Sequence, residues 1–537
     1  MKLTFVGAAH EVTGSCHYLY ACKKHILIDC GMEQGQNLYE NVEIPVDEAL
    51  IDYVLLTHAH IDHSGLIPLL YARGFRGKVF ASEATVDLCN IMLRDSAHIQ
   101  MFEAEWRNRK AKRSSGVSEY VPLYNMQDAD GAIKCLVPCH YGKKVQLCEG
   151  IEVCFNDVGH LLGSAAIEVW VNEPEGSKKI VFSGDIGNLN QPLIRNPGLI
   201  KEADYVVMES TYGDRYHDAD RVDYVTELTA LLQETFDKGG NVVIPSFAVG
   251  RTQEMLYFLR KIKAERLVHG HEHFKVYVDS PLAVEATNVF NKNIYECFDE
   301  EAMQLVNKGI NPISFGGLSL SITSDESKSI NFDEEPKVIL SASGMCEAGR
   351  IRHHLKHNLW REECTVLFVG YQAIGTLGRS LVEGAKEVKL FGETVEVRAK
   401  VTSLKGLSGH ADKGGLTDWI NGFEKQPERV FIVHGDDTVC DEYADYLHEH
   451  FGFDTYAPYS GTCFDLQKNE CIYEAEGVRV APKKAKAAAA VFDRLVAAGQ
   501  RLMAVIFKNE GVANKDLAKF ADQINSLSDK WDRDKQS

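Results

Sequence analysis

Residues 57–63 of this chain read Thr-His-Ala-His-Ile-Asp-His and follow directly on the apolar run of residues 53–56. Such a run predicts a buried strand, so the polar residues begin where the strand ends. His58 and His60 offer ligands to one cation, while Asp62 and His63 could turn toward a second. The spacing therefore predicts a two-metal site, although a histidine-rich surface loop would produce the same short motif.

Further candidate residues recur at comparable places far along the chain. Asp185, Glu209 and His434 each stand at or just after the end of an apolar run. His160 and His410 lie beside glycines, as expected of imidazoles that project from loops into a packed site. Because the ends of neighbouring parallel strands meet at one edge of a sheet, this repeated placement predicts one shared site.

Two carboxylates that follow apolar strands could contribute to such a site. Asp185 follows the apolar residues 180–182 and could place one oxygen on each of two cations about 3.5–4 Å apart. Asp29 also ends an apolar strand, where it could be a turn former or could orient a metal-bound imidazole by accepting its second N–H. The sequence leaves these two roles for Asp29 open.

The elements that must position these residues change character along the chain. Beyond residue 213 strands and helices alternate, which predicts an α/β domain with a parallel sheet, and a β pattern returns near residue 385. Ligands meet such sheets at the carboxyl ends of the strands, so a phosphate-binding rim is expected there. Its candidate residues are Ser343, Arg350, Arg379 and Ser408.

Length and composition limit the possible classes. A chain of 537 residues with 45% hydrophobic and 25% charged residues predicts a globular protein of at least two domains. No stretch is apolar enough to span a membrane, and residues 1–11 lack the apolar segment of a signal peptide, so we expect a cytoplasmic location. The net charge of −19 disfavours a general polyanion binder, so nucleic acid would need a local basic groove or the metals themselves.

Other clusters of metal-binding or basic residues are more simply explained by packing or by exposure to solvent. The cysteines include no C-x-x-C pair and are expected to be buried thiols, Cys135 and Cys139 near His140 among them. The basic run at 107–113 ends an expected helix over residues 82–113, with Ser82 as its N-cap, and is more typical of a solvated face than of an RNA contact. The remaining histidine sets are read as surface features: His269, His271, His273, His353 and His357.

Together these residues resemble the metallo-β-lactamase superfamily, and in particular its β-CASP branch of nucleic-acid nucleases. The resemblance rests on the H-x-H-x-D-H run with the later carboxylates and histidines in this order, and it extends to about residue 475. It implies an α/β (α+β) fold, a four-layer αβ/βα sandwich with an inserted α/β β-CASP domain and a helical C-terminal tail. The expected boundaries are 1–212 and 385–480 for the two parts of the sandwich, 213–384 for the insert and 481–537 for the tail.

The resemblance also implies roles for the site residues. His58, His60 and His160 would bind one zinc ion, and Asp62, His63 and His434 a second, with manganese as another occupant of the same ligands. Asp185 would bridge the two ions, and Asp29 would support the site from behind. Asp62, Asp185, Glu209 and His410 form the expected catalytic set, in which His410, polarised by Glu209, protonates the leaving oxygen.

A histidine at the position of His434 is typical of members that act on RNA, and residues 341–350 and 370–379 resemble prokaryotic relatives of the endonuclease subunit of the pre-mRNA 3′-end cleavage machinery. The expectation is a zinc-dependent ribonuclease that hydrolyses single-stranded RNA, in endonucleolytic mode, 5′-exonucleolytic mode or both. The alternatives are a DNA nuclease of the same fold and a catalytically silent RNA-binding scaffold, although silent members usually lack ligands that are all present here. A homodimer formed through the tail stays open.

Overall fold

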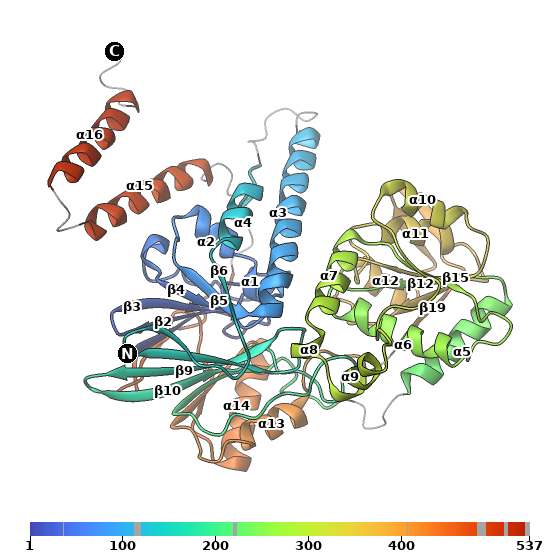
Figure 1. Ribbon diagram of the computed structural model, residues 1–537, viewed down its shortest axis with the longest axis horizontal. Coiled ribbons are helices and arrows are strands. Elements are labelled where there is room, and N and C mark those ends of the chain that lie inside the picture. The colour runs from blue at the N-terminus through green and yellow to red at the C-terminus, as the bar shows by residue number, and fades with distance from the viewer. Residues whose placement is uncertain are drawn as a thin grey trace.

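The computed structural model describes residues 1–35, 37–111, 120–217, 223–404, 406–480, 490–509 and 514–531. Figure 1 shows a sandwich built from the blue, teal and orange parts of the chain, an inserted body in green and yellow beside it, and two red helices at the C-terminal end. The insert is connected within the sandwich, because the chain leaves it after β11 and returns before β20.

The sandwich is made of two mixed sheets. The first has eight strands in the order β23 (Glu470–Tyr473), β22 (Cys463–Asp465), β1 (Lys2–Gly7), β2 (Cys16–Ala21), β3 (Lys24–Ile28), β4 (Tyr53–Leu55), β5 (Lys78–Ser82) and β6 (Leu136–Cys139). The second has seven, in the order β21 (Thr455–Tyr456), β20 (Arg429–Val433), β11 (Tyr205–Glu209), β10 (Gly176–Phe182), β9 (Ala165–Glu173), β8 (Ile151–Asp157) and β7 (Val145–Cys148).

Alternation along the strands determines which core each side chain joins. Phe182 and Val207 lie in the core between the two sheets, whereas Val181 and Val206, one residue away, pack against the helices outside. Side chains one residue apart point to opposite faces of a strand, so both faces of these strands are buried. The result is the expected four-layer αβ/βα sandwich.

Helices cover both outer faces of the sandwich. The first sheet is covered by η1 (Glu48–Leu50), α1 (Ile61–Ser64), α2 (Ile67–Ala72), α3 (Glu83–Ala111) and α4 (Met126–Ile133), and the second by α13 (Lys413–Asn421) and α14 (Asp437–Phe451). The Ser82 hydroxyl accepts a hydrogen bond from Thr85 N, which confirms the expected helix start. Residues 112–119 lie outside the described part, so the end of the basic run at 107–113 does too.

The inserted body has a parallel sheet of six strands in the order β14 (Leu318–Leu320), β13 (Lys275–Val278), β15 (Lys337–Ser341), β12 (Val242–Pro245), β16 (Thr365–Phe368) and β19 (Lys400–Ser403). Its helices are α5 (Tyr224–Asp237), α6 (Arg251–Ala264), α7 (Pro281–Lys292), α8 (Ile294–Cys297), α9 (Glu300–Asn307), α10 (Ser324–Phe332), α11 (Ile351–Asn358) and α12 (Leu377–Val382). This arrangement agrees with the predicted parallel α/β domain.

The expected boundary at residue 385 falls inside this inserted body. The hairpin of β17 (Glu387–Leu390) and β18 (Glu393–Glu396) packs Val388, Leu390 and Val395 into the insert's core. β19 then pairs in parallel with β16 and closes the edge of the insert's sheet. The β pattern after residue 385 is real, but these strands complete the insert, and the chain rejoins the sandwich only after residue 403.

The C-terminal tail forms α15 (Ala490–Lys508) and α16 (Asn514–Trp531), and Figure 1 shows α16 standing away from the sandwich. Ala504 of α15 is buried, whereas Leu495 and Phe507 are exposed. Residues 481–489, the first part of the expected tail, lie outside the described part. Among the described residues no helix combines the length and apolarity needed to cross a membrane.

Candidate metal centre

The predicted site residues gather at one edge of the sandwich. Asp29 follows β3 and His58 follows β4, two parallel neighbours in the first sheet. Asp185, Glu209 and His434 follow or end β10, β11 and β20, three parallel neighbours in the second sheet. Since parallel neighbours end at the same edge, the two sheets bring these residues together.

Loops and one short helix supply the other side chains. Helix α1 begins after His60 and contains Asp62 and His63, so this single turn directs three of the residues inward. His160 lies in the loop between β8 and β9, where the Ser164 hydroxyl accepts a hydrogen bond from its backbone N–H. His410 lies in the loop before α13, and its segment pairs with Gly187 in an isolated β-bridge.

These side chains form three groups of possible metal ligands, of which the first and the third share a member. His58, His60, His160 and Asp185 form the first, Asp62, His63 and His434 the second, and Asp185, Glu209 and His410 the third, with one ligand atom of each member within 4.8 Å of the others in its group. Asp185 thus belongs to two groups. Its Oδ2 lies 3.4 Å from His58 Nε2, and its Oδ1 lies 3.2 Å from His63 Nε2.

Nitrogen atoms face one another in both histidine groups. His58 Nε2 lies 3.0 Å from His60 Nδ1, His160 Nε2 lies 3.2 Å from the same Nδ1, and His63 Nε2 lies 3.1 Å from His434 Nε2. Burial lowers the pKa of His60 to about 4, and burial also holds the pKa values of His58 and His160 well below the ordinary value. These three imidazoles are therefore neutral, and their lone pairs are available as ligands.

Asp185 is the central acceptor of the cluster, and its Oδ1 lies 3.2 Å from His63 Nε2 and 3.6 Å from His434 Nε2. Its Oδ1 is buried and makes no hydrogen bond within the described part of the chain. Burial opposes its ionisation, but nearby His434 and His63 hold the pKa of its carboxyl well below the usual range. A buried ionised oxygen without a hydrogen bond is costly, and a cation between it and converging imidazoles removes that cost. The donor set therefore fits divalent metal ions.

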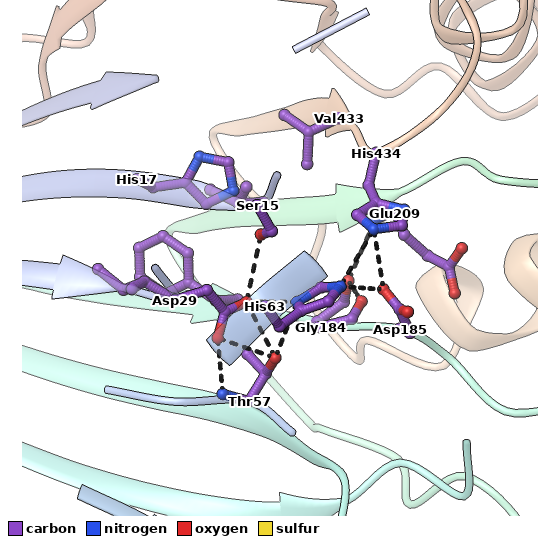
Figure 2. A pocket seen from close by; sticks show the side chains of 14 residues that line it. Ser15, His17, Asp29, Thr57, His63, Gly184, Asp185, Glu209, Val433 and His434 are labelled. Atoms are coloured by element: carbon purple, nitrogen blue, oxygen red, sulfur yellow. Dashed lines mark hydrogen bonds and ion pairs between the residues drawn. The ribbon is translucent and has the colours of Figure 1, made fainter. Parts of the chain in front are cut away.

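Asp29 orients His63 from behind, as Figure 2 shows. Its Oδ2 lies 2.7 Å from His63 Nδ1 and 3.2 Å from the Ser15 hydroxyl that donates to it, and its carboxylate also accepts from Thr57 N and Thr57 Oγ1. A carboxylate on Nδ1 fixes the tautomer that presents Nε2 inward. Of the two roles that the sequence left open, this geometry favours orientation of an imidazole.

His410 pairs with Glu209 at the open side of the cluster. Its Nδ1 lies 3.2 Å from both oxygens of Glu209, which is itself buried and accepts from Ile186 N and Thr211 N. Burial lowers the pKa of His410, but the Glu209 carboxylate outweighs it and raises that pKa to about 9. The His410 side chain is 21% exposed and its Nε2 lies 3.9 Å from Asp185 Oδ2, so a proton on Nε2 faces the cluster.

The candidate phosphate contacts are not all free to bind a phosphate. Arg350 Nη1 donates to Asp279 Oδ1 at 2.7 Å and Arg379 Nε donates to Glu383 at 2.6 Å. Ser408 Oγ accepts from His410 N, which makes it a support for that loop, and Ser343 Oγ is buried without a hydrogen bond among the described residues. Their role toward phosphate stays a prediction.

The structure adds partners that the sequence did not single out. Thr57 Oγ1 donates to Asp29, and Thr211 Oγ1 lies 3.2 Å from His434 Nδ1. Thr57 directly precedes His58 and Thr211 lies two residues after Glu209, which was the available signal. His140 lies near Glu83 and Glu296, 3.6 Å from each, and the grouping found for it contains neither Cys135 nor Cys139.

Parts of the chain match models of known protein families. Three family models match: the metallo-beta-lactamase superfamily over residues 11–78, the Beta-Casp domain over 252–381, and a Zn-dependent metallo-hydrolase RNA specificity domain over 394–458. The first contains the H-x-H-x-D-H run, and the last contains His410 and His434.

Curated relatives cover most of the chain. Ribonuclease TTHA0252 of Thermus thermophilus is 38% identical over 81% of this chain and 94% of its own length. In Methanocaldococcus jannaschii, an RNase J-like protein is 32% identical over 86% of this chain and 99% of its own, and transcription termination factor FttA is 30% identical over 85% and 70%. The chain therefore belongs to the β-CASP ribonucleases, a branch of the metallo-β-lactamase superfamily of metal-dependent hydrolases.

Proposed function

We propose that this protein is a zinc-dependent ribonuclease that hydrolyses phosphodiester bonds of single-stranded RNA at a two-metal centre. The observation that carries the proposal is Asp185, whose ionised carboxylate lies between two sets of imidazoles with one oxygen free of hydrogen bonds. This arrangement matches a carboxylate that bridges two cations. The zinc-dependent RNA specificity model over residues 394–458 supports both the metal and the substrate.

The residues sort into two ligand sets with a shared member. His58, His60 and His160 would hold one ion, and Asp62, His63 and His434 the other. Asp185 would bind both, since its Oδ2 lies 3.4 Å from His58 Nε2 and its Oδ1 lies 3.2 Å from His63 Nε2. Two such ions, when bound, supply activation of the attacking water and neutralisation of the charge that develops on the phosphate. The protein's own contribution is to hold these ligands in fixed positions, which Asp29 does for His63.

His410 and Glu209 are the proposed proton-donor pair. Glu209 holds the imidazole through Nδ1, so that the proton on Nε2 faces the reacting phosphate. In-line attack of water would then leave a 5′-phosphate, and the departing 3′-oxygen would take its proton from His410. The raised pKa of His410 keeps it protonated at neutral pH, and nearby cations would bring that pKa down toward the range of an efficient acid.

RNA is the proposed substrate because of His434 and the relatives. His434 stands at the position where the resemblance associates histidine with RNA, and two of the matched relatives are named as ribonuclease or RNase J-like. An acidic chain of net charge −19 would meet RNA mainly at the metal cluster. Manganese as an alternative ion, a 5′-exonucleolytic mode, a cytoplasmic location and self-association through the tail belong to the same proposal.

The test is cleavage of matched end-labelled single-stranded RNA and DNA by wild-type protein of known metal content. RNA cleavage to products with 5′-phosphate and 3′-hydroxyl ends supports the proposal. Cleavage of DNA alone would favour the DNA nuclease, and RNA binding by metal-loaded protein without cleavage would favour a silent scaffold. Two variants separate the roles: Asp185→Ala should lose bound metal and activity, whereas His410→Ala should lose activity and retain metal.

A further inference from the structure

An exposed aromatic side chain stands on a firmly held loop of the insert. Phe247 lies between β12 and α6 at the carboxyl edge of the parallel sheet and is 44% exposed. Hydrogen bonds hold the loop on both sides of it, because Ser246 N donates to Ser341 O at 3.1 Å and Thr252 Oγ1 donates to Phe247 O at 2.6 Å. Because the loop is already held in place, little conformational entropy is lost when a ligand covers the Phe247 side chain.

One part of the Phe247 ring rests on bare backbone. A Cβ added to Gly344 would lie 3.2 Å from the ring atoms, and a Cβ added to Gly370 would lie 3.4 Å from them. Gly344 and Gly370 follow β15 and β16, the two strands beside β12. The absence of side chains at these glycines lets the ring sit close to both loops, which fixes its position while the rest of the ring stays exposed.

The end of this loop and the start of α6 lie beside the two segments that carry His160 and His410. A Cβ on Gly250 would lie 3.1 Å from Leu161 Cδ1, next to His160, and Arg251 Nη2 donates to Leu407 O at 2.7 Å. His160 Nδ1 in turn lies 3.1 Å from Gly409 O, beside His410. Phe247 therefore stands on the part of the insert that adjoins the reaction site.

We propose that Phe247 is a stacking platform for the base of a nucleotide close to the scissile phosphate. The inference rests on the proposed action on RNA and adds a base-binding position to the ligand and acid residues. Aromatic stacking holds unpaired bases without reading their identity, because every base has a π-face. Such a contact would hold the strand in register with the metals in an acidic protein that offers little general attraction to phosphate.

The experiment combines a variant series with RNA in which single bases have been removed. Wild-type protein, Phe247→Ala, Phe247→Leu and Phe247→Trp are compared for kcat, KM and RNA affinity by fluorescence anisotropy on one oligonucleotide with a unique cut site. Phe247→Ala should raise KM and Kd about tenfold, within the 5- to 150-fold range expected for one stacked base. Phe247→Trp should keep both constants near the wild-type values. Phe332→Ala is the matched control: Phe332, at the end of α10, is 78% exposed in the same body and should change nothing.

Abasic substitutions identify the contact itself. For wild-type protein, removal of the base at one position near the cut site should weaken binding about tenfold, and the same removal should cost nothing further with Phe247→Ala. Equal behaviour of Phe247→Leu and Phe247→Trp, or an abasic penalty that persists in Phe247→Ala, would overturn the stacking role and leave a packing role. Wild-type protein that binds RNA without cutting it would refute the proposed ribonuclease, and the anisotropy series would still decide on Phe247.

Discussion

Asp185 and Asp279 are both buried carboxylates that lie just beyond the end of a strand, Asp185 in a mixed sheet of the sandwich and Asp279 in the parallel sheet of the insert. Both contact histidine side chains. Asp279, after β13, has its oxygens filled by donors: Arg350 Nη1 at 2.7 Å, His354 Nε2 at 2.7 Å and Ser327 Oγ at 2.5 Å. Asp185 has an oxygen with no hydrogen bond among the described residues. The same residue types thus form two different sites.

The hydrogen bonds of the carboxylate distinguish a cluster that only stabilises the fold from one that can bind a metal ion. A carboxylate whose hydrogen-bonding capacity is filled by its own chain has nothing left for a cation, so the Asp279 cluster holds α10 and α11 against the sheet. A buried carboxylate among imidazoles, with one oxygen free of hydrogen bonds, can still accept a cation. The next four predictions test this comparison, from the largest expected effect on RNA cleavage to the smallest.

Asp185→Ala should reduce kcat at least about 10³-fold, because it removes the proposed bridging ligand and with it charge stabilisation in the transition state. Bound metal, measured by mass spectrometry of the dialysed protein, should fall as well. Far-UV circular dichroism serves as the folding control. Full metal content with full activity would mean that Asp185 is not a ligand.

His410→Ala should reduce kcat by about 10² to 10⁴-fold, the usual contribution of a general acid, with metal content unchanged. An RNA with sulfur in place of the 3′-bridging oxygen provides the sharper measurement. A thiolate leaves without a proton, so the deficit of the variant should shrink on this substrate. A deficit of equal size on both substrates would show that His410 does not protonate the leaving group.

Asp29→Asn should reduce metal affinity or activity by about 10- to 100-fold, the usual effect of losing the partner of a ligand imidazole. The amide cannot accept from Thr57 N, Thr57 Oγ1 and His63 Nδ1 as the carboxylate does. Metal affinity is measured by competition with a chromogenic chelator. Ser15→Ala, which removes one neutral donor to Asp29, is the milder control, and an Asp29→Asn variant no weaker than it would contradict the orienting role.

Asp279→Ala should leave kcat per folded molecule nearly unchanged but lower the free energy of unfolding by about 3–5 kcal/mol, because it strands the buried partners of an ion pair. Denaturant unfolding of the variant measures this. The hydrogen bonds from His354, Ser327 and Arg350 outweigh burial and lower the pKa of Asp279. Its stabilising contribution is therefore present above the unfolded pKa of about 3.9 and lost as pH falls through the folded value, so wild type and variant should converge in stability in strong acid.

The convergence of most candidate ligands could be predicted from the sequence because its signal is local. Each of His58, Asp185 and His434 stands just past an apolar run, and strand ends in a sandwich of this kind converge. The parallel insert followed from the alternation of strands and helices, whereas the four-layer sandwich was expected from the resemblance to the metallo-β-lactamase superfamily. The roles of the individual side chains depend on contacts between distant parts of the chain. These roles stay predictions, which the proposed experiments test.

Other features depended on long-range packing that no local pattern reports. The return of β structure near residue 385 gave no sign that β19 would pair with β16 instead of rejoining the sandwich. Arg350 is of a residue type that often binds phosphate, but its partner Asp279 lies 71 residues away in the chain. His353 and His357 drew attention as a helical pair, whereas the buried histidine of that helix is His354 between them. The fixed position of the Phe247 ring depends on its packing against Gly344 and Gly370, which no local sequence pattern predicts.

The central claim is that the Asp185 cluster binds two metal ions that RNA cleavage requires. The most direct measurement is a zinc titration of metal-free wild-type protein, with bound zinc and the single-turnover rate of RNA cleavage recorded at each point. Without metal no cleavage is expected, and the rate should rise until two equivalents are bound per chain. Cleavage by the metal-free protein, or two bound equivalents with no cleavage of RNA, would contradict it.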